Sequence, residues 1–446
     1  MKRANVHKIN QLITRGKHLF DTDSLFRNSV FLIASTAIMS VLGFLFWLSV
    51  AHLYTPEQIG SASALIAATT LLGNMSLLGL EYSLIRFLPK SKNQSRDINA
   101  TIGFVAAAAA LAGIAYLFVS PLLNIHISHL EDPLLRVGFV VLMIVVSLNS
   151  LTDAVFIANR RAELHTLTYS VLALVKLLLP LALVPFGSLG IFAGYAVAML
   201  SSLTLTFFLM RRHVGYKPQS KPNWSLLRQV RTYAANNYIG HILASLSPQL
   251  MPLIILNGLG AEKVAYFAMA ITIANFLYVI PVAISQSLLA ESAGSPEDKR
   301  AHIRGAVKIL SLILVPAVTI AVLAAPWLLN IFGHEYSANS TTLFQILAFA
   351  TFFITVSEVG NAVLNIEHRS SGVVASQLSC VVVTLVATIL LLPHGLVGVG
   401  IALVLGNIAS NISHLVFFTF GIGKKKEPLE ESEALAHERG EENRLT

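Results

Sequence analysis

Cysteine and charged residues are scarce in this sequence. Among its 446 residues Cys380 is the one cysteine, and only 12% of the residues are charged. A single thiol excludes an internal disulfide and a metal site built from several thiolates. No glycine-rich loop followed by Lys and Ser or Thr occurs, which excludes a Walker-type nucleotide site. The low charge also departs from soluble domains, in which about 25% of the residues are charged.

Long apolar stretches take the place of the missing charge, and hydrophobic residues make up 55% of the chain. They form runs of about 20 residues, the length at which a helix crosses the hydrocarbon core of a bilayer. The sequence therefore predicts an all-α integral membrane protein with twelve transmembrane helices. The expected spans are 29–54, 60–82, 100–120, 134–158, 165–186, 188–210, 236–257, 264–290, 306–331, 340–366, 370–392 and 396–421.

Basic residues gather between the spans on one side of the expected membrane. With the N-terminus in the cytoplasm, all but three of the 31 Lys and Arg residues fall in cytoplasmic segments, as the positive-inside rule requires. The exceptions are Arg136, Lys263 and Lys176. We therefore expect a multi-pass protein of the cell (plasma) membrane with both termini in the cytoplasm. The net charge of +8 then reflects topology and attraction to anionic lipid, and does not indicate nucleic-acid binding.

Two pairs of similar segments indicate an internal repeat. LVPFGSLGIFAGYAVAML from Leu183 is similar to LLPHGLVGVGIALVLGNI from Leu391, and YTPEQIGSASAL from Tyr54 to LGAEKVAYFAMA from Leu259. Copies of six helices enter the membrane in the same direction, so we expect two six-helix lobes related as parallel repeats. The predicted organisation is a basic cytoplasmic N-terminal segment (1–28), an N-lobe (29–210), a cytoplasmic connector (211–235), a C-lobe (236–421) and a disordered cytoplasmic tail (422–446).

Several motifs resemble a known family. YTPEQIG, LGLEYSLIRFLP, NGLGAEKVAYFAMA and IFGHEYSANSTTLFQILA, together with the two Pro/Gly hairpins, resemble the polysaccharide-transporter (Wzx-like flippase) branch of the MOP superfamily, over roughly residues 28–421. That superfamily also contains MATE drug exporters and lipid II flippases. The resemblance implies two lobes in a V around a central cavity. It also implies translocation of a polyprenyl (pyro)phosphate- or dolichyl-linked oligosaccharide to the outer leaflet by alternating access, for cell-surface polysaccharide or glycan biosynthesis.

Lys176 is a basic residue inside an expected span, in the stretch LALVKLLLPLA. A lysine at a helix centre costs about 2.5–3.5 kcal/mol on membrane-insertion scales, and about 15 Å of helix separates it from either end of the span. At helical spacing it shares a face with Tyr169 and Pro180. We expect a cation that, with Tyr169, lines the cavity and binds the phosphate of the lipid carrier. A structural ion pair and a misplaced span are the alternatives.

Asp153 and Glu358 are acids inside expected spans. Asp153 is a candidate for ion coupling or for an interfacial pair with Arg160. Glu358 lies on a stripe with Asn361 and is a candidate ion-coupling carboxylate, a partner of Lys176 or a hydrogen-bonding group between helices. Protons and sodium are the candidate ions.

The seventh span carries a polar stripe and two prolines. The polar residues are candidates for hydrogen bonds to sugar hydroxyls, with contacts between helices as the alternative. Prolines remove backbone donors and permit kinks, so we expect hinges there and in the fifth span. The polar residues are Asn237, His241 and Ser245, and the expected hinges are Pro180, Pro248 and Pro252.

Two residues near the ends of spans are further candidates for substrate binding. Arg86 closes the second span and either anchors the topology or meets the incoming phosphate. His52 stands where many of the resembling proteins carry an arginine, and because histidine is readily neutral, a fixed cation is not implied there. The first span contains no acid, in contrast to the drug-exporter branch.

Three classes of function remain open: a flippase, a drug or cation antiporter of MATE type, and a membrane enzyme, either a polymerase or a ligase, that acts on the same lipid carrier. An enzyme needs convergent acids, bases or metal ligands. The grouping of His126, His129, Glu131 and Asp132 fits no standard metal spacing. We therefore predict no enzyme, no metal and no cofactor. The expected partners are a lipid-linked oligosaccharide, membrane lipids and glycan-assembly proteins.

Overall fold

The computed structural model describes residues 24–122, 132–218, 223–294, 299–367 and 369–420. Within these ranges the chain is almost entirely helical and contains no strand. The tail 422–446, most of the segment 1–28 and residues 123–131, with His126, His129 and Glu131, lie outside the described residues. The side chains of Asn237 and His241 are likewise outside the description.

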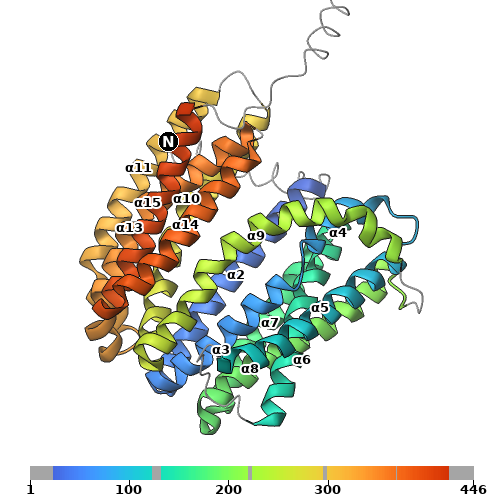
Figure 1. The fold of residues 1–446 in the computed structure, drawn as a ribbon, viewed down its shortest axis with the longest axis horizontal. Coiled ribbons are helices and arrows are strands. Elements are labelled where there is room, and N and C mark those ends of the chain that lie inside the picture. Colours follow the sequence, from blue (N-terminus) through green and yellow to red (C-terminus); the bar gives the residue numbers. More distant parts are fainter. Residues whose placement is uncertain (1–23, 123–131, 219–222, 295–298, 368, 421–446) are drawn as a thin grey trace, which may run out of the picture.

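The helices form two groups that lie side by side (Figure 1). The first group is drawn on the right and the second on the left, while α2 and α9 run between them. The first group comprises α2 (Ser24–Leu53), α3 (Pro56–Met75), α4 (Leu80–Phe87), η1 (Leu88–Lys90), α5 (Gln94–Leu122), α6 (Pro133–Ala158), α7 (Ala162–Ala182), η2 (Val184–Phe186), α8 (Gly187–Leu209) and η3 (Met210–Val214). The second comprises α9 (Trp224–Leu259), α10 (Ala261–Gly294), α11 (Lys299–Leu323), α12 (Ala325–Asn330), α13 (His334–Ile366), α14 (Ser370–Leu391), η5 (Leu392–His394) and α15 (Gly395–Phe420).

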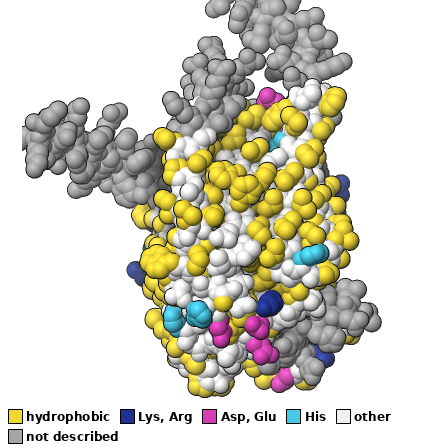
Figure 2. Space-filling view, turned by 90° about the vertical axis from the view of Figure 1, so that its left-hand side faces the viewer, with side chains coloured by type: hydrophobic (Ala, Val, Ile, Leu, Met, Phe, Trp, Pro, Cys, Tyr) yellow, Lys and Arg dark blue, Asp and Glu magenta, His cyan; other side chains and the backbone are white. Residues whose placement is uncertain are grey.

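Most of these helices are long and apolar enough to cross a membrane. The described ranges contain nine such helical stretches, or up to ten when the bent pair Pro56–Met75 and Leu80–Lys90 counts as one span. One stretch, Ser370–Phe420, holds both α14 and α15, and α11 contributes a shorter apolar segment. Figure 2 shows a face with a largely hydrophobic middle and charged and histidine side chains near its lower edge. The multi-pass all-α fold is confirmed, and the count of twelve spans stays a prediction.

The two Pro/Gly hairpins have matching backbone geometry. Gly187 and Gly395 take positive φ angles of 56° and 65°, which favour glycine. A Cβ atom on Gly190 would lie 2.1 Å from a carbonyl oxygen of its hairpin, and one on Gly398 would lie 2.0 Å from the corresponding oxygen. The glycines in the two similar segments are therefore required by the same tight turn.

The motif YTPEQIG builds one end of the molecule, which also carries the two Pro/Gly hairpins and which we call the hairpin end. Thr55 caps α3, because its hydroxyl accepts a hydrogen bond from the Gln58 backbone while the Gln58 side chain accepts one from the Thr55 backbone. The Tyr54 hydroxyl donates to the carbonyl oxygen of Pro180 at 2.5 Å. This bond ties the turn between α2 and α3 to α7.

The two groups of helices touch backbone to backbone at the hairpin end. A Cβ atom on Gly60 of α3 would lie 1.7 Å from the carbonyl oxygen of Ala261 at the start of α10. Around this contact a single hydrophobic core joins both groups and includes Phe46, Ile59 and Val264, all at most 1% exposed. The hairpin end is therefore a place where the two groups of helices are in direct contact.

The second expected span is broken. The axis bends by 51° between Pro56–Met75 and Leu80–Lys90, where Leu78 and Gly79 take positive φ angles. A Cβ atom on Gly79 would lie 2.2 Å from the carbonyl oxygen of Ala234. The bend thus lets α4 pack directly on the backbone of α9, whose first residues lie within the predicted connector 211–235.

Candidate functional site

A cavity of about 550 Å³ lies between the two groups of helices. Helices α2 and α3 supply part of its wall, and α9, α10, α13, α14 and α15 supply the rest. Pro248 and Pro252 of α9, two of the expected hinges, line it. Its polar lining consists of Ser63, Ser247, Gln249, Thr272, Asn275, Tyr278, Glu358, Gln377, Cys380, Thr384 and Asn407.

Two smaller cavities lie beside α2 and share lining residues with their neighbours. The first, of about 200 Å³, lies between α2 and α10 and shares Trp47 and Asn275 with the central cavity. The second, of about 370 Å³, lies between α2 and α7, shares Ser40 with the first, and is lined by His165 and Tyr169. The shared residues place the three cavities next to one another along α2.

Glu358 is the acid in the described lining of the central cavity. Its stripe neighbour Asn361 has another role, because the Asn361 side-chain oxygen accepts a hydrogen bond from Ser376 at 3.2 Å and lies 3.0 Å from Nε2 of His414. Asn361 therefore joins α13 to α14 and α15, while Glu358 faces the cavity. Glu358 and Asn361, which helical spacing placed on one stripe, therefore have different surroundings in the structure.

Lys176 lies among aromatic rings. Its Nζ atom is 4.5 Å from the centroid of Phe46, 5.7 Å from that of Tyr195 and 6.0 Å from that of Trp47. A desolvated cation over an aromatic face gains about 2 kcal/mol or more. The ion pairs among the described residues are Arg161–Glu163 and Arg369–Glu367, so neither Asp153 nor Glu358 pairs with the ammonium.

This cage offsets the burial of the Lys176 charge without a carboxylate. Lys176 is not among the described residues that line the three cavities, but Trp47, which contacts it, lines two of them. The Trp47 ring therefore lies between the ammonium and these two cavities or beside it.

A buried polar cluster lies in the first group of helices. Asp153 of α6 is 8% exposed and lies close to the Tyr169 hydroxyl of α7. The His165 ring stacks on Tyr169 with 4.3 Å between centroids. Among the described residues Asp153 forms no ion pair with Arg160. The cluster thus connects a buried carboxyl to the cavity between α2 and α7 through two rings.

Other predicted residues lie away from the central cavity. His52 is exposed near the hairpin end, and its Nδ1 lies 2.9 Å from the carbonyl oxygen of Leu48. The Ser245 hydroxyl donates to a carbonyl one turn earlier in α9. Pro180 accepts the hydrogen bond from Tyr54 described above.

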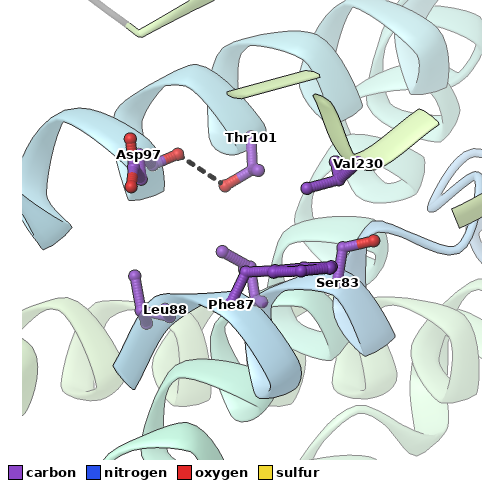
Figure 3. A pocket seen from close by; sticks show the side chains of 7 residues that line it. Ser83, Phe87, Leu88, Asp97, Thr101 and Val230 are labelled. Atoms are coloured by element: carbon purple, nitrogen blue, oxygen red, sulfur yellow. Dashed lines mark hydrogen bonds between the residues drawn. The ribbon is translucent and has the colours of Figure 1, made fainter. Parts of the chain in front are cut away.

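The opposite end of the first group, which we call the connector end, carries Arg86 and a network that the sequence did not indicate. The Arg86 guanidinium lies 4.6 Å from the ring centroid of Tyr233 in α9. In the small pocket of Figure 3, Asp97 and Thr101 on one helix face Ser83 and Phe87 on another.

Asp97 holds the connector onto the first group of helices. Its carboxylate accepts hydrogen bonds from the Ser91 hydroxyl at 2.5 Å and from Nδ2 of Asn223 at 2.7 Å. The Tyr216 hydroxyl donates to Asn99 at 2.6 Å, and burial raises the pKa of this hydroxyl above its usual value, which keeps the donated proton in place. These side chains are polar residues of loops and helix ends, so no periodic pattern marked them.

The solved structures that resemble this chain share its fold. The lipid II flippase MurJ in an inward closed conformation is 13% identical, with 87% of each chain covered and a TM-score of 0.68. A multidrug resistance MATE family transporter of the MOP superfamily in its inward-facing conformation is 14% identical, with 87% of this chain and 97% of the other covered and a TM-score of 0.66. An outward-facing MATE structure is also 14% identical, covers 90% of this chain and 95% of its own, and has a lower TM-score of 0.54.

The sequence comparisons identify the family. No curated protein matches the chain significantly. The model of the family described as polysaccharide biosynthesis protein matches residues 25–289, which is more than half of the chain and includes the hairpin-end motif and the start of the second group of helices. The chain therefore belongs to the polysaccharide biosynthesis protein family, and its fold is similar to that of the MATE and MurJ structures.

Proposed function

We propose that the protein is a flippase or exporter of a polyprenyl (pyro)phosphate- or dolichyl-linked oligosaccharide, which it moves from the cytoplasmic to the outer leaflet of the cell membrane for cell-surface polysaccharide or glycan biosynthesis. The observation that carries the proposal is the central cavity of about 550 Å³ between two groups of membrane helices. Ligand pockets span about 300–1,000 Å³, so this space can hold part of an oligosaccharide while the lipid stays in the bilayer.

The mechanism we propose is alternating access. The lobes are closed at the hairpin end by the contact of Gly60 with Ala261, and the TM-score is higher to the inward-facing than to the outward-facing MATE structure. Both observations support an inward-facing state, with the hairpin end on the outer side of the membrane. Separation of α3 from α10 would then open the cavity outward.

Different side chains would bind the phosphate and the sugar parts of the cargo. Lys176 and Arg86 are our candidates for binding the phosphate groups, together with His52. Tyr169, a further candidate, lines the cavity between α2 and α7. Asn237, His241 and Ser245 of α9 remain candidates for contacts with the sugar. An ammonium held at a fixed position in a cleft attracts a phosphate strongly because little water screens the pair.

Glu358 and Asp153 are the groups we propose for ion coupling, with protons or sodium as the driving ions. Glu358 faces the central cavity, and Asp153 connects to the cavity between α2 and α7 through Tyr169 and His165. Intramembrane carboxyls of this kind are functional by default because they are costly to bury. Occupation of either site would shift the balance between two lobe arrangements only if its affinity differs between them.

A drug or cation antiporter is the second candidate function, favoured by the Glu358 carboxyl in the central cavity. A lipophilic cation would be attracted by that single acid. A membrane enzyme is disfavoured, because the solved structures that share this fold are a multidrug transporter and a lipid II flippase.

The test is depletion of the protein in its host, followed by mass spectrometry of the lipid-linked glycans. We expect a complete oligosaccharide to accumulate on its carrier, and re-expression of the parent chain to clear it. Truncated glycans would point instead to an enzyme of assembly. An unchanged profile together with increased sensitivity to lipophilic cations would support the antiporter.

A further inference from the structure

Three of the hydroxyl groups that line the central cavity donate their protons to the backbone. Ser63, Thr272 and Tyr278 each donate to a backbone carbonyl oxygen, at 2.7, 2.6 and 3.1 Å respectively. A hydroxyl has one proton and two lone pairs. Once the proton is committed to the helix, the hydroxyl presents only acceptor sites to a ligand.

Two of the amide side chains in the lining, those of Asn407 and Gln377, present acceptors as well. Nδ2 of Asn407 donates to the backbone carbonyl oxygen of Leu403 within α15 at 2.9 Å. The side-chain oxygen of this lining residue remains as an acceptor. The Oε1 atom of Gln377 is buried and has no hydrogen-bond partner among the described residues. A buried acceptor without a partner is costly, so this atom is suited to a ligand that brings a donor.

The charge of the described lining agrees in sign with these acceptors. Glu358 is its one carboxylic acid, and the described lining contains no Lys, Arg or His. Lys176 is held over Phe46 and beside Trp47 and does not belong to this lining. A carboxylate in the cavity would meet acceptors and a like charge, whereas a neutral sugar would offer hydroxyl and amide donors.

We propose that the central cavity binds the glycan part of the cargo and selects an uncharged glycan, rich in hydroxyl and amide N–H donors, over a glycan that carries carboxylates. This selectivity rests on the proposed flippase function. Phosphate binding is left to cations outside this cavity, so the two ends of the cargo are recognised by opposite chemistry. Trp47 adds an aromatic face on which the apolar side of a sugar ring can pack.

Two synthetic lipids test the selectivity. Both are polyprenyl diphosphate disaccharides, identical except that the terminal sugar is a hexose in one and the corresponding uronic acid in the other. Binding to the full chain in nanodiscs is measured by scintillation proximity with the radiolabelled lipids. We expect the dissociation constant of the neutral lipid to be at least ten-fold lower than that of the acidic lipid.

Two variants assign the selectivity to this cavity. Glu358→Gln should reduce the preference for the neutral lipid, whereas the matched change Glu335→Gln, at an exposed position on the same helix, should leave it unchanged. Gln377→Leu should weaken binding of the neutral lipid by about two- to ten-fold, the effect of one hydrogen bond. It should not lower the melting temperature of the free protein, because it removes an unpartnered acceptor, and this separates ligand binding from a structural role.

Each alternative outcome has a definite meaning. Equal or tighter binding of the acidic lipid would overturn the selectivity while leaving the flippase intact. Normal binding of the neutral lipid by Gln377→Leu would overturn the assignment to this cavity. Binding of neither lipid by a folded protein that binds a lipophilic cation would overturn the proposed function itself.

Discussion

A single methyl group at Gly60 should prevent closure of the hairpin end. In Gly60→Ala the new Cβ atom would start 1.7 Å from the carbonyl oxygen of Ala261, 2.5 Å from its carbonyl carbon and 3.1 Å from its Cα. The obstructing atoms are backbone and cannot rotate away. The starts of α3 and α10 must therefore separate until the first distance exceeds 3.0 Å, the lower limit for real Cβ contacts.

The cost of this separation falls on the closed state alone. Overpacking of a well-packed contact typically costs about 1–3 kcal/mol, which lowers the population of the closed state about 5- to 150-fold relative to the open one. Alanine is favoured over glycine within a helix by up to about 1 kcal/mol, and this gain is common to both states. The expected result is a protein that folds but rests in the outward-open arrangement.

Spin labels at the hairpin end would report the separation. Glu57 and Glu335 are exposed there, one in each group of helices, so cysteines at these positions in a Cys380→Ser background give one distance between the lobes. In Gly60→Ala the distance distribution should move to longer values, and transport should fall. Gly103→Ala is the matched control, because a Cβ atom at Gly103 of α5 meets nothing within 4 Å.

The reasoning would be refuted by a Gly60→Ala protein with the distance distribution and transport rate of the parent. That result would mean that the backbone contact is not the closure point. A shift of equal size in Gly103→Ala would instead attribute the effect to helix propensity.

Three further predictions concern side chains. Lys176→Gln should abolish transport at equal expression and Lys176→Arg should retain part of it, because the cage and the phosphate both require a cation; activity of Lys176→Gln equal to the parent would remove the proposed role. Tyr54→Phe should lower the free energy of unfolding by about 0.5–1.5 kcal/mol, seen as a lower melting temperature, since the bond to Pro180 is lost; an unchanged melting temperature would argue against that bond. Asp97→Ala should destabilise the protein by about 1–3 kcal/mol, and adding Asn223→Ala should cost little more because the two share a hydrogen bond; fully additive losses would contradict the coupling.

The sequence predicted the features that depend on local chemistry. The glycines of the two hairpins were visible because tight turns require particular residue types. The apolar runs predicted membrane helices because a helix of about 20 apolar residues crosses the hydrocarbon core of a bilayer. Glu358 stood out as an acid in the middle of a span, and it lines the central cavity, while its role in ion coupling stays a prediction.

Features that join distant segments were not predictable. The break between α3 and α4 needs positive φ angles at Leu78 and Gly79. A leucine rarely takes a positive φ angle, so its presence gives no sign of such a turn. The connector network around Asp97 uses ordinary polar residues whose partners lie more than a hundred positions away. Single-sequence periodicity carries no information on such pairs.

Composition and residue spacing by themselves determined that the chain is a helical membrane protein with repeated hairpins, because bilayer thickness and turn geometry constrain each segment separately. The tertiary structure decided what surrounds each buried polar group. It set Lys176 among three rings from α2 and α8 instead of a carboxylate, and it directed Glu358 and Gln377 to one cavity. The energy of a buried charge depends on atoms a few ångströms away, and folding alone brings those atoms together.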